Sequence, residues 1–173
     1  MIILPYKGAI PKISNDCFVA ENATIVGDVI IDSESSIWFG ASIRAERGSV
    51  RIGKRVNIQD NCVIHTDDDE CVIGDGVSVG HSAVVHGATI GSNTLVGMGS
   101  ILMNGSRIGR NSIIGAAALV TQDAVFPDGS LILGSPAALK RKLTSEEISK
   151  ISENAAHYNE FRCDYIQMTK TTR

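Results

Sequence analysis

The chain has 173 residues, a formal net charge of −3 and 43% hydrophobic residues. This length fits one domain with a sizeable core, and the composition is neither that of a disordered chain nor that of a fibrous one. The mildly negative charge gives no reason to expect nucleic acid or a membrane surface as a partner. Residues 1–5 contain no long apolar run, so we expect a cytoplasmic protein without a secretory or transmembrane segment.

A six-residue repeat of aliphatic side chains begins at Ile13 and predicts a solenoid of short strands. A small or slender residue lies four positions after most of these aliphatic residues, as Cys17 does after Ile13. Both side chains point inward, each unit forms one strand and one corner, and three units close a triangular coil. We therefore predict an all-β solenoid, a parallel β-helix of hexapeptide repeats. The aliphatic positions are Ile13, Val19, Ile25, Ile31, Ile37, Ile43, Ile52, Ile58, Ile64, Ile73, Val79, Val85, Ile90, Val96, Leu102, Ile108, Ile114 and Val120.

The repeat is broken at three places. Three extra residues fall within residues 44–48, another three fall within residues 66–70, and one residue is missing between Val85 and Ile90. Insertions in a solenoid protrude at its corners and leave the core stack undisturbed. We therefore expect two protruding loops on neighbouring turns.

Three of the four cysteines occupy inward small-residue positions of the repeat, namely Cys17, Cys62 and Cys71. A free cysteine packs as a small apolar side chain. We predict core packing for all three, rather than metal binding or redox chemistry.

The repeat ends near Gly134, and a helix is predicted beyond it. Thr144 and Glu147 have the spacing of a capping box, and apolar residues at helical spacing follow them. The apolar stripe of this helix is expected to pack on the solenoid or on a neighbouring subunit. The predicted organisation is a β-helix domain at residues 1–139 and a C-terminal helix with its tail at residues 140–173.

Three histidines lie within one coil of the repeat. His65 and His86 occupy the same position of their units, one full coil apart, so their side chains should stack on neighbouring strands about 5 Å apart. His81 lies in the intervening unit, on another face of the triangle. A threefold-symmetric trimer that packs one face against the next would bring His81 to the other two.

Three imidazoles with an open fourth position are typical of a catalytic zinc site. Such a metal lowers the pKa of its bound water to about 7 and supplies hydroxide at neutral pH. Iron(II) or cobalt(II) can do similar chemistry with the same ligands. We therefore expect zinc as the cofactor, with iron or cobalt as alternatives.

Five stretches of the repeat carry further specific motifs: Ser36-Ile37-Trp38-Phe39-Gly40, Val56-Asn57-Ile58-Gln59-Asp60, Val63-Ile64-His65, Val79-Gly80-His81 and Val85-His86-Gly87. With the rest of the chain they resemble the gamma-class carbonic anhydrase family. The resemblance implies a left-handed β-helix that assembles as a homotrimer. It also implies metal sites between subunits, formed by His65 and His86 of one chain and His81 of the adjacent chain.

The same resemblance implies roles for the residues around the metal. Gln59 with Asn57 would orient metal-bound water and substrate, and Tyr158 would lie near the site on the helix. Arg44 and Asp60 resemble the family's intersubunit ion pair. From the residues alone, Gln59 can equally pack a corner, and the ion pair can serve only to hold the trimer together.

Two features depart from the family pattern. Residues 44–46 read Arg-Ala-Glu where the family has Arg-Gly-Asp, and we expect a structural role for the longer acid. The family's long acidic loop, which supplies a proton-shuttle glutamate, is reduced here to residues 66–70. Asp67 and Asp68 lie two and three residues after His65, and we hypothesise that they form a reduced proton shuttle. The alternative is a solvated loop without a chemical role.

The predicted function is the reversible hydration of carbon dioxide to bicarbonate, in which hydroxide on the metal attacks the carbon. The chain would then be a zinc-dependent lyase whose partner is carbon dioxide, bicarbonate or another small molecule. An acyl-CoA-using acetyltransferase or thioesterase is one alternative, because hexapeptide acyltransferases share the solenoid and Gly134-Ser135-Pro136-Ala137 resembles their exit segment. A metal-binding protein with little activity is the other.

Overall fold

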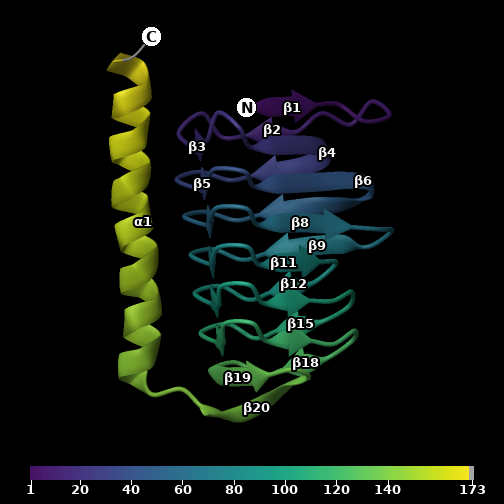
Figure 1. The fold of residues 1–173 in the computed structure, drawn as a ribbon, viewed down its shortest axis with the longest axis vertical. Helices are drawn as coiled ribbons and strands as arrows, with labels where there is room; N and C mark the ends of the chain where they lie inside the picture. Colours follow the sequence, from purple (N-terminus) through teal and green to yellow (C-terminus); the bar gives the residue numbers. More distant parts are fainter. Residues whose placement is uncertain (172–173) are drawn as a thin grey trace.

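The six-residue repeat folds into a left-handed parallel β-helix of about seven turns, as predicted, and a long helix follows it (Figure 1). The computed structural model describes residues 1–171. One sheet contains β1 (Ile2–Leu4), β2 (Lys12–Ile13), β4 (Thr24–Ile31), β6 (Ser42–Ile52), β8 (Val63–Thr66), β9 (Glu70–Ile73), β11 (Val84–His86), β12 (Thr89–Ile90), β14 (Ile101–Leu102), β15 (Arg107–Ile108), β17 (Leu119–Val120) and β18 (Val125–Phe126). The other contains β3 (Phe18–Val19), β5 (Ser36–Ile37), β7 (Asn57–Ile58), β10 (Ser78–Val79), β13 (Leu95–Val96), β16 (Ile113–Ile114), β19 (Ser130–Gly134) and β20 (Ala137–Lys142).

Aliphatic side chains at the same position of successive coils form continuous stacks in the core. The missing residue after Val85 does not disturb this register, because Ile90 still pairs with Ile73 on one side and Ile108 on the other. Burial of each such side chain stabilises the fold by roughly 1.5–3 kcal/mol. One stack, each member 0% exposed, consists of Ile25, Ile43, Ile64, Val85, Leu102 and Val120.

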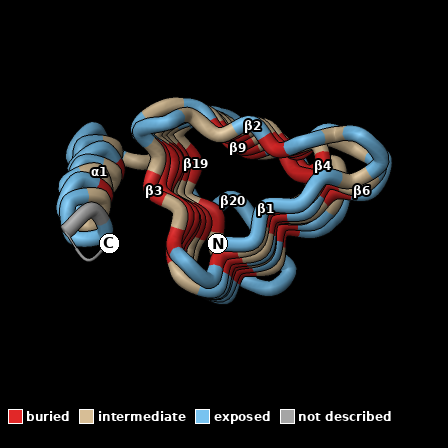
Figure 2. Tube along the Cα trace, turned by 90° about the horizontal axis from the view of Figure 1, so that it is seen from above, coloured by how far each residue is buried: buried red, intermediate tan, exposed pale blue. Residues whose placement is uncertain are grey.

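The two insertions behave differently from one another. Residues 67–69 form a bend between β8 and β9, as expected, whereas residues 44–48 belong to the continuous strand β6. The prediction of a protruding loop at residues 44–48 is therefore wrong. The reason is that both insertions add the same length on neighbouring coils, so β6 pairs with β8 through its first half and with β9 through its second half. The long strands β4 and β6 extend away from the side on which the helix lies (Figure 2).

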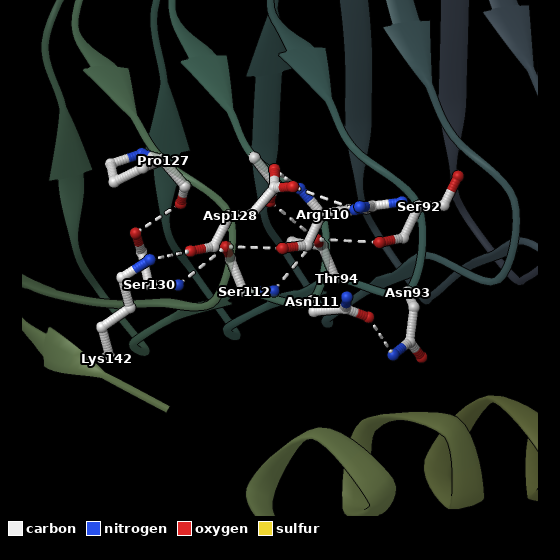
Figure 3. Close-up of polar contacts among 11 residues, drawn as sticks. Ser92, Asn93, Thr94, Arg110, Asn111, Ser112, Pro127, Asp128, Ser130 and Lys142 are labelled. Carbon is white, nitrogen blue, oxygen red and sulfur yellow. Dashed lines mark hydrogen bonds and ion pairs between the residues drawn. The ribbon is translucent and has the colours of Figure 1, made fainter. Parts of the chain in front are cut away.

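Hydroxyl side chains fill several inward small-residue positions and bind the backbone of the next coil. Thr94, Ser112 and Ser130 are each 0% exposed. The Thr94 Oγ1 atom accepts a hydrogen bond from the backbone N–H of Ser112 at 3.3 Å, and the Ser112 Oγ atom accepts one from Ser130 N–H at 3.1 Å (Figure 3). These residues lie along one corner of the solenoid. Corner N–H groups that no strand pairs are thereby satisfied without water.

The solenoid is closed at its C-terminal end by an antiparallel strand that the repeat does not predict. β20 pairs with β19, and α1 (Ser145–Thr171) follows it. The predicted capping box is confirmed: the Thr144 Oγ1 atom accepts from Glu147 N–H at 3.2 Å, and the Glu147 carboxylate accepts from Thr144 N–H at 2.9 Å. A frayed tail is predicted at residues 169–173, but the helix continues through Thr171, and residues 172–173 lie outside the described part of the chain.

Helix α1 packs back on the solenoid along β3, β5, β7 and β10, which is one of the two predicted arrangements (Figure 2). Aromatic rings form most of this contact. Trp38 lies 5.1 Å from Phe18 and 5.7 Å from Tyr158 between ring centroids, and Tyr165 packs on both Phe18 and Trp38. The helix therefore covers the face formed by the second sheet.

Cys62 and Cys71 lie in the core, as predicted, whereas Cys17 is half-buried and packs against the core. Cys62 and Cys71 are 0% exposed, and burial raises the pKa of each thiol to about 11. Both thiols therefore stay protonated at neutral pH. Within residues 1–171, no helix combines the length and the apolar character that crossing a bilayer requires.

Candidate metal centre

Two of the three predicted ligands stack as the repeat predicts. His65 on β8 and His86 on β11 are direct register partners, and their ring centroids lie 4.8 Å apart. The Nδ1 atom of His65 lies 2.9 Å from the Nε2 atom of His86. We call these two residues the stacked pair.

Each ring of the stacked pair has a second contact on its outer nitrogen. The Nε2 atom of His65 lies 3.0 Å from the Oε2 atom of Glu46, and the Nδ1 atom of His86 contacts the Oδ1 atom of Asn104. A structural role is predicted for Glu46, and the structure places its carboxylate against a predicted metal ligand. The sequence patterns do not predict a role for Asn104, although its position one coil after His86 could have indicated that the two side chains meet.

The hydrogen-bond capacity of the stacked pair tests whether it fits a metal. Two neutral imidazoles carry two N–H groups, and the acceptors Glu46 and Asn104 take one each. The inner nitrogens of His65 and His86 then face each other through lone pairs at 2.9 Å, an arrangement that a shared cation stabilises. Histidines that bind metal commonly donate their other N–H to a carboxylate or a carbonyl group. The donor set therefore fits zinc or a similar divalent ion.

The two aspartates of the short loop lie in different surroundings. Ligand atoms of Asp67, His65 and His86 all lie within 4.8 Å of one another, and the Asp67 Oδ2 atom accepts a hydrogen bond from Asn104 Nδ2 at 3.3 Å. Asp68 instead forms an ion pair with Arg47 at 3.1 Å, and its side chain is 71% exposed. An open cavity of about 360 Å³ adjoins the loop, lined by Tyr6, Arg44, Glu46, Arg47, His65, Thr66 and Asp67.

The third predicted ligand, His81, lies at a corner directly after β10, outside the group formed by the stacked pair. Its Nδ1 atom lies 2.9 Å from the Oδ2 atom of Asp60. Its backbone N–H donates to the Oε1 atom of Gln59 at 3.1 Å. Among the residues that the structure describes, one chain thus presents two predicted ligands at one place and the third at another.

The polar residues predicted to orient water and substrate lie on the His81 side. The Gln59 Nε2 atom donates to Asn57 Oδ1 at 3.0 Å, and the Asn57 Nδ2 atom donates to Ser78 Oγ at 2.8 Å. Gln59 is 5% exposed and Asn57 is 1% exposed. This chain of amides fixes the orientation of the Gln59 side chain, because each end of the amide has a partner.

Tyr158 approaches the same side from the helix. Its ring packs edge-on against Trp38, and burial, followed by the negative charge of Asp60, raises the pKa of its phenol. The phenol therefore stays protonated at neutral pH, so it can donate a hydrogen bond. Helix α1 contacts β7 and β10, the strands just before Gln59 and His81, so Tyr158 belongs to the element that packs on this side.

Arg44 and Asp60 do not pair with each other inside one chain. Arg44 forms an ion pair with Glu46, and Asp60 contacts His81. Their side chains are 47% and 37% exposed, so both remain accessible to another subunit. The predicted pair between Arg44 and Asp60 therefore remains a prediction about the oligomer.

Exposed apolar side chains lie on the same face as the stacked pair. Val63 on β8 is 38% exposed, Ile101 on β14 is 42% exposed, and Met103 directly after β14 is 40% exposed. Exposed apolar residues that gather on one face are typical of a surface that binds another protein.

The fold and the site define a hexapeptide-repeat β-helix protein with a histidine centre, and comparisons with known proteins narrow the class. A family model described as the GMPPB C-terminal domain matches residues 25–152. Carbonic anhydrase from Geobacillus kaustophilus is 42% identical over 160 residues, which cover 92% of this chain and 88% of that protein. Gamma carbonic anhydrase 1 of Arabidopsis thaliana mitochondria is 40% identical over 156 residues, or 86% of this chain. The chain belongs to the gamma carbonic anhydrase family.

Two further comparisons bear on length and on fold. The match spans 57% of the Arabidopsis protein, so that relative is considerably longer than the region shared with this chain. The crystal structure of a Bacillus cereus protein named as a candidate acetyltransferase superposes with a TM-score of 0.95 at 39% identity, and the match covers 96% of this chain and 98% of that one. The family therefore includes proteins named for two different activities.

Proposed function

We propose that this chain is a metal-dependent enzyme that hydrates carbon dioxide reversibly to bicarbonate. The observation that carries the proposal is the stacked pair, whose inner nitrogens lie 2.9 Å apart while Glu46 and Asn104 engage the outer ones. Relatives named carbonic anhydrase support the choice of reaction.

The metal ligands in this proposal are His65 and His86 of one chain and His81 of the partner subunit. Zinc held by three imidazoles lowers the pKa of water to about 7 and so supplies a nucleophile at neutral pH, chemistry that iron(II) or cobalt(II) can share. Glu46, Asn104 and Asp60 hold the three rings in place, because each accepts from a ring nitrogen.

Assembly as a homotrimer completes the site. Val63, Ile101 and Met103 are exposed on the face that carries the stacked pair, and burial between subunits would remove this apolar surface from water. Arg44 on that face would pair with Asp60 of the partner subunit. Because Asp60 contacts His81, the same ion pair would bring the third ligand to the other two.

Gln59, Asn57 and Tyr158 are proposed to orient the reactants. Asn57 holds the Gln59 amide, so the second N–H of that amide keeps a fixed direction in which it can bind water or carbon dioxide. The protonated phenol of Tyr158 provides a further donor on this side. Ordered donors at the reaction centre lower the barrier because they need no reorganisation during the reaction.

Asp68 is proposed to exchange the proton with buffer. Its carboxylate is exposed and lies three residues after His65, in the loop that contains Asp67. Its side chain is 71% exposed, and a solvated carboxylate beside the site can pass a proton to buffer.

Metal analysis and parallel assays test the proposal. The purified protein should contain about one zinc or similar ion per chain as a trimer, and it should accelerate carbon dioxide hydration in stopped-flow measurements. Acyl-CoA thioesters should be assayed in parallel, because a structural relative is named as a candidate acetyltransferase. Acyl transfer or thioester hydrolysis without hydration would contradict the proposal, and so would stoichiometric metal in a stable monomer. Metal binding without either activity would reduce the chain to a metal-binding protein.

A further inference from the structure

The stacked pair brings two different nitrogens together. Equivalent atoms of register partners on parallel strands lie about 4.8 Å apart, and the two ring centroids do lie 4.8 Å apart. Two nitrogens that share a tetrahedral zinc ion lie roughly 3.3 Å apart, given zinc–nitrogen bonds of about 2.0–2.1 Å. The Nδ1 atom of His65 and the Nε2 atom of His86 lie 2.9 Å apart, which is close to this spacing, so these are the two nitrogens placed to share an ion.

We propose that Glu46 and Asn104 are positioning residues that select these two nitrogens. Glu46 holds the Nε2–H group of His65, which leaves the Nδ1 lone pair for the metal. Asn104 holds the Nδ1–H group of His86, which leaves the Nε2 lone pair. This inference rests on the metal centre of the proposed function and assigns the ligand atom of each ring.

The surroundings of Glu46 fix which of its oxygens faces the histidine. The Oε1 atom contacts Arg44, and the Oε2 atom lies 3.0 Å from His65 Nε2. A carboxylate only accepts hydrogen bonds, so the proton of this contact must lie on the histidine. The side chain of Glu46 is 24% exposed, and that of His65 is 18% exposed, so the contact is partly shielded from water. The longer acid at position 46 thus determines the tautomer of His65.

The surroundings of Asn104 fix the orientation of its amide. The Nδ2 atom donates to the Asp67 carboxylate at 3.3 Å, which leaves the Oδ1 atom directed at His86. An amide oxygen only accepts, so His86 must carry its proton on Nδ1. Asp67 therefore acts on the stacked pair through Asn104. The two outer contacts together produce opposite tautomers in two histidines at identical repeat positions.

Zinc affinity, measured by competition with a chelator, tests the roles of these residues. Glu46→Ala and Asn104→Ala should each weaken zinc binding about 10–100-fold, the usual effect of losing such a partner. Glu46→Gln keeps an acceptor oxygen and should lose less than Glu46→Ala. Glu70→Ala is the matched control, because the Glu70 carboxylate contacts Ser49 and Arg51 instead of a histidine, and its affinity should be unchanged. Native-like affinity in Glu46→Ala and Asn104→Ala would overturn the inference.

Nitrogen-15 NMR of the histidine rings in the zinc-loaded trimer reads the tautomers directly. The native protein should show His65 protonated at Nε2 and His86 protonated at Nδ1, and Glu46→Gln, which retains the shape of the side chain, should keep this pattern. The same protonated nitrogen in both rings would overturn the inference. If zinc affinity and tautomers behave as expected but carbon dioxide is not hydrated, only the proposed reaction fails. A native trimer that binds no zinc would overturn both proposals.

Discussion

The stacked pair and His81 belong to one coil of the same repeat, yet their surroundings differ. His65 lies on a strand, its side chain is 18% exposed, and the neighbouring ring and Glu46 occupy its two nitrogens. His81 lies at a corner, its side chain is 44% exposed, and Asp60 engages only its Nδ1 atom. The pair is thus organised within one chain, whereas the Nε2 atom of the corner histidine has no partner within residues 1–171. This difference divides the candidate centre into a two-ligand half and a one-ligand half, which another subunit would join in the proposed trimer.

The largest expected effect comes from removing the corner histidine. His81→Ala should lose bound metal and lower hydration to the uncatalysed rate, because the stacked pair alone provides two imidazoles. The fold should persist, since the His81 side chain contributes nothing to the core. Metal content, activity and thermal unfolding check this, with His157→Ala on the exposed part of the helix as the histidine control. Full metal content in His81→Ala would show that one chain completes the site.

The next effect concerns the contact between the two halves. Arg44→Ala and Asp60→Asn should each weaken the trimer by about 1.5–3 kcal/mol, because a charge-assisted hydrogen bond across the interface is lost. Sedimentation on dilution measures this. Arg110→Ala, which removes an exposed ion pair with Asp128, should leave assembly unchanged. If Asp60→Asn stays trimeric at high dilution and yet loses all activity, the pair acts in the reaction rather than in assembly.

A smaller effect on turnover is expected from removing Gln59, which lies beside His81. Gln59→Ala should lower kcat for hydration about 10–100-fold, because a fixed donor at the reaction centre is lost. Metal content should stay native, since Gln59 contacts the backbone of His81 and not its ring. The exposed Gln122→Ala serves as control. Unchanged kcat would mean that Gln59 only packs the corner.

The smallest effect concerns the loop beside the stacked pair. The double variant Asp67→Asn with Asp68→Asn should lower turnover about fivefold at low buffer concentration, because proton export becomes limiting. More buffer should restore the rate, and the exposed Asp69→Asn should behave as native. Kinetics that stay native at low buffer would leave the loop without a role in proton transfer.

The sequence predicts the parts of the centre that the repeat itself positions. The stacking of His65 and His86 follows from their identical place one coil apart, and the structure confirms it. The separation of His81 from this pair follows from the same register, and His81 does lie outside the group. Periodicity fixes which strand and which face a residue occupies, and this is sufficient for side chains on regular strands.

The remaining features depend on what periodicity does not describe. Glu46 reaches His65 from the bulging part of β6, and Asn104 reaches His86 from a corner of the next coil, so both contacts depend on side-chain rotamers. The first insertion continues as a strand because an insertion of equal length lies on the neighbouring coil and pairs with it. The prediction of two loops did not take this pairing into account. β20 has no place in the repeat, because it runs antiparallel to β19 after the solenoid ends.

A subunit-mixing experiment tests the central claim, which is that one site takes ligands from two chains. One variant carries His81→Ala, and the other carries His65→Ala and His86→Ala, so neither homotrimer holds a complete site. After the two are unfolded and refolded together, threefold symmetry gives every mixed trimer one interface with all three ligands. The account predicts that mixed trimers regain about one metal ion each, together with hydration activity. Mixed trimers that remain free of metal and inactive, beside a native trimer that binds metal, would contradict it.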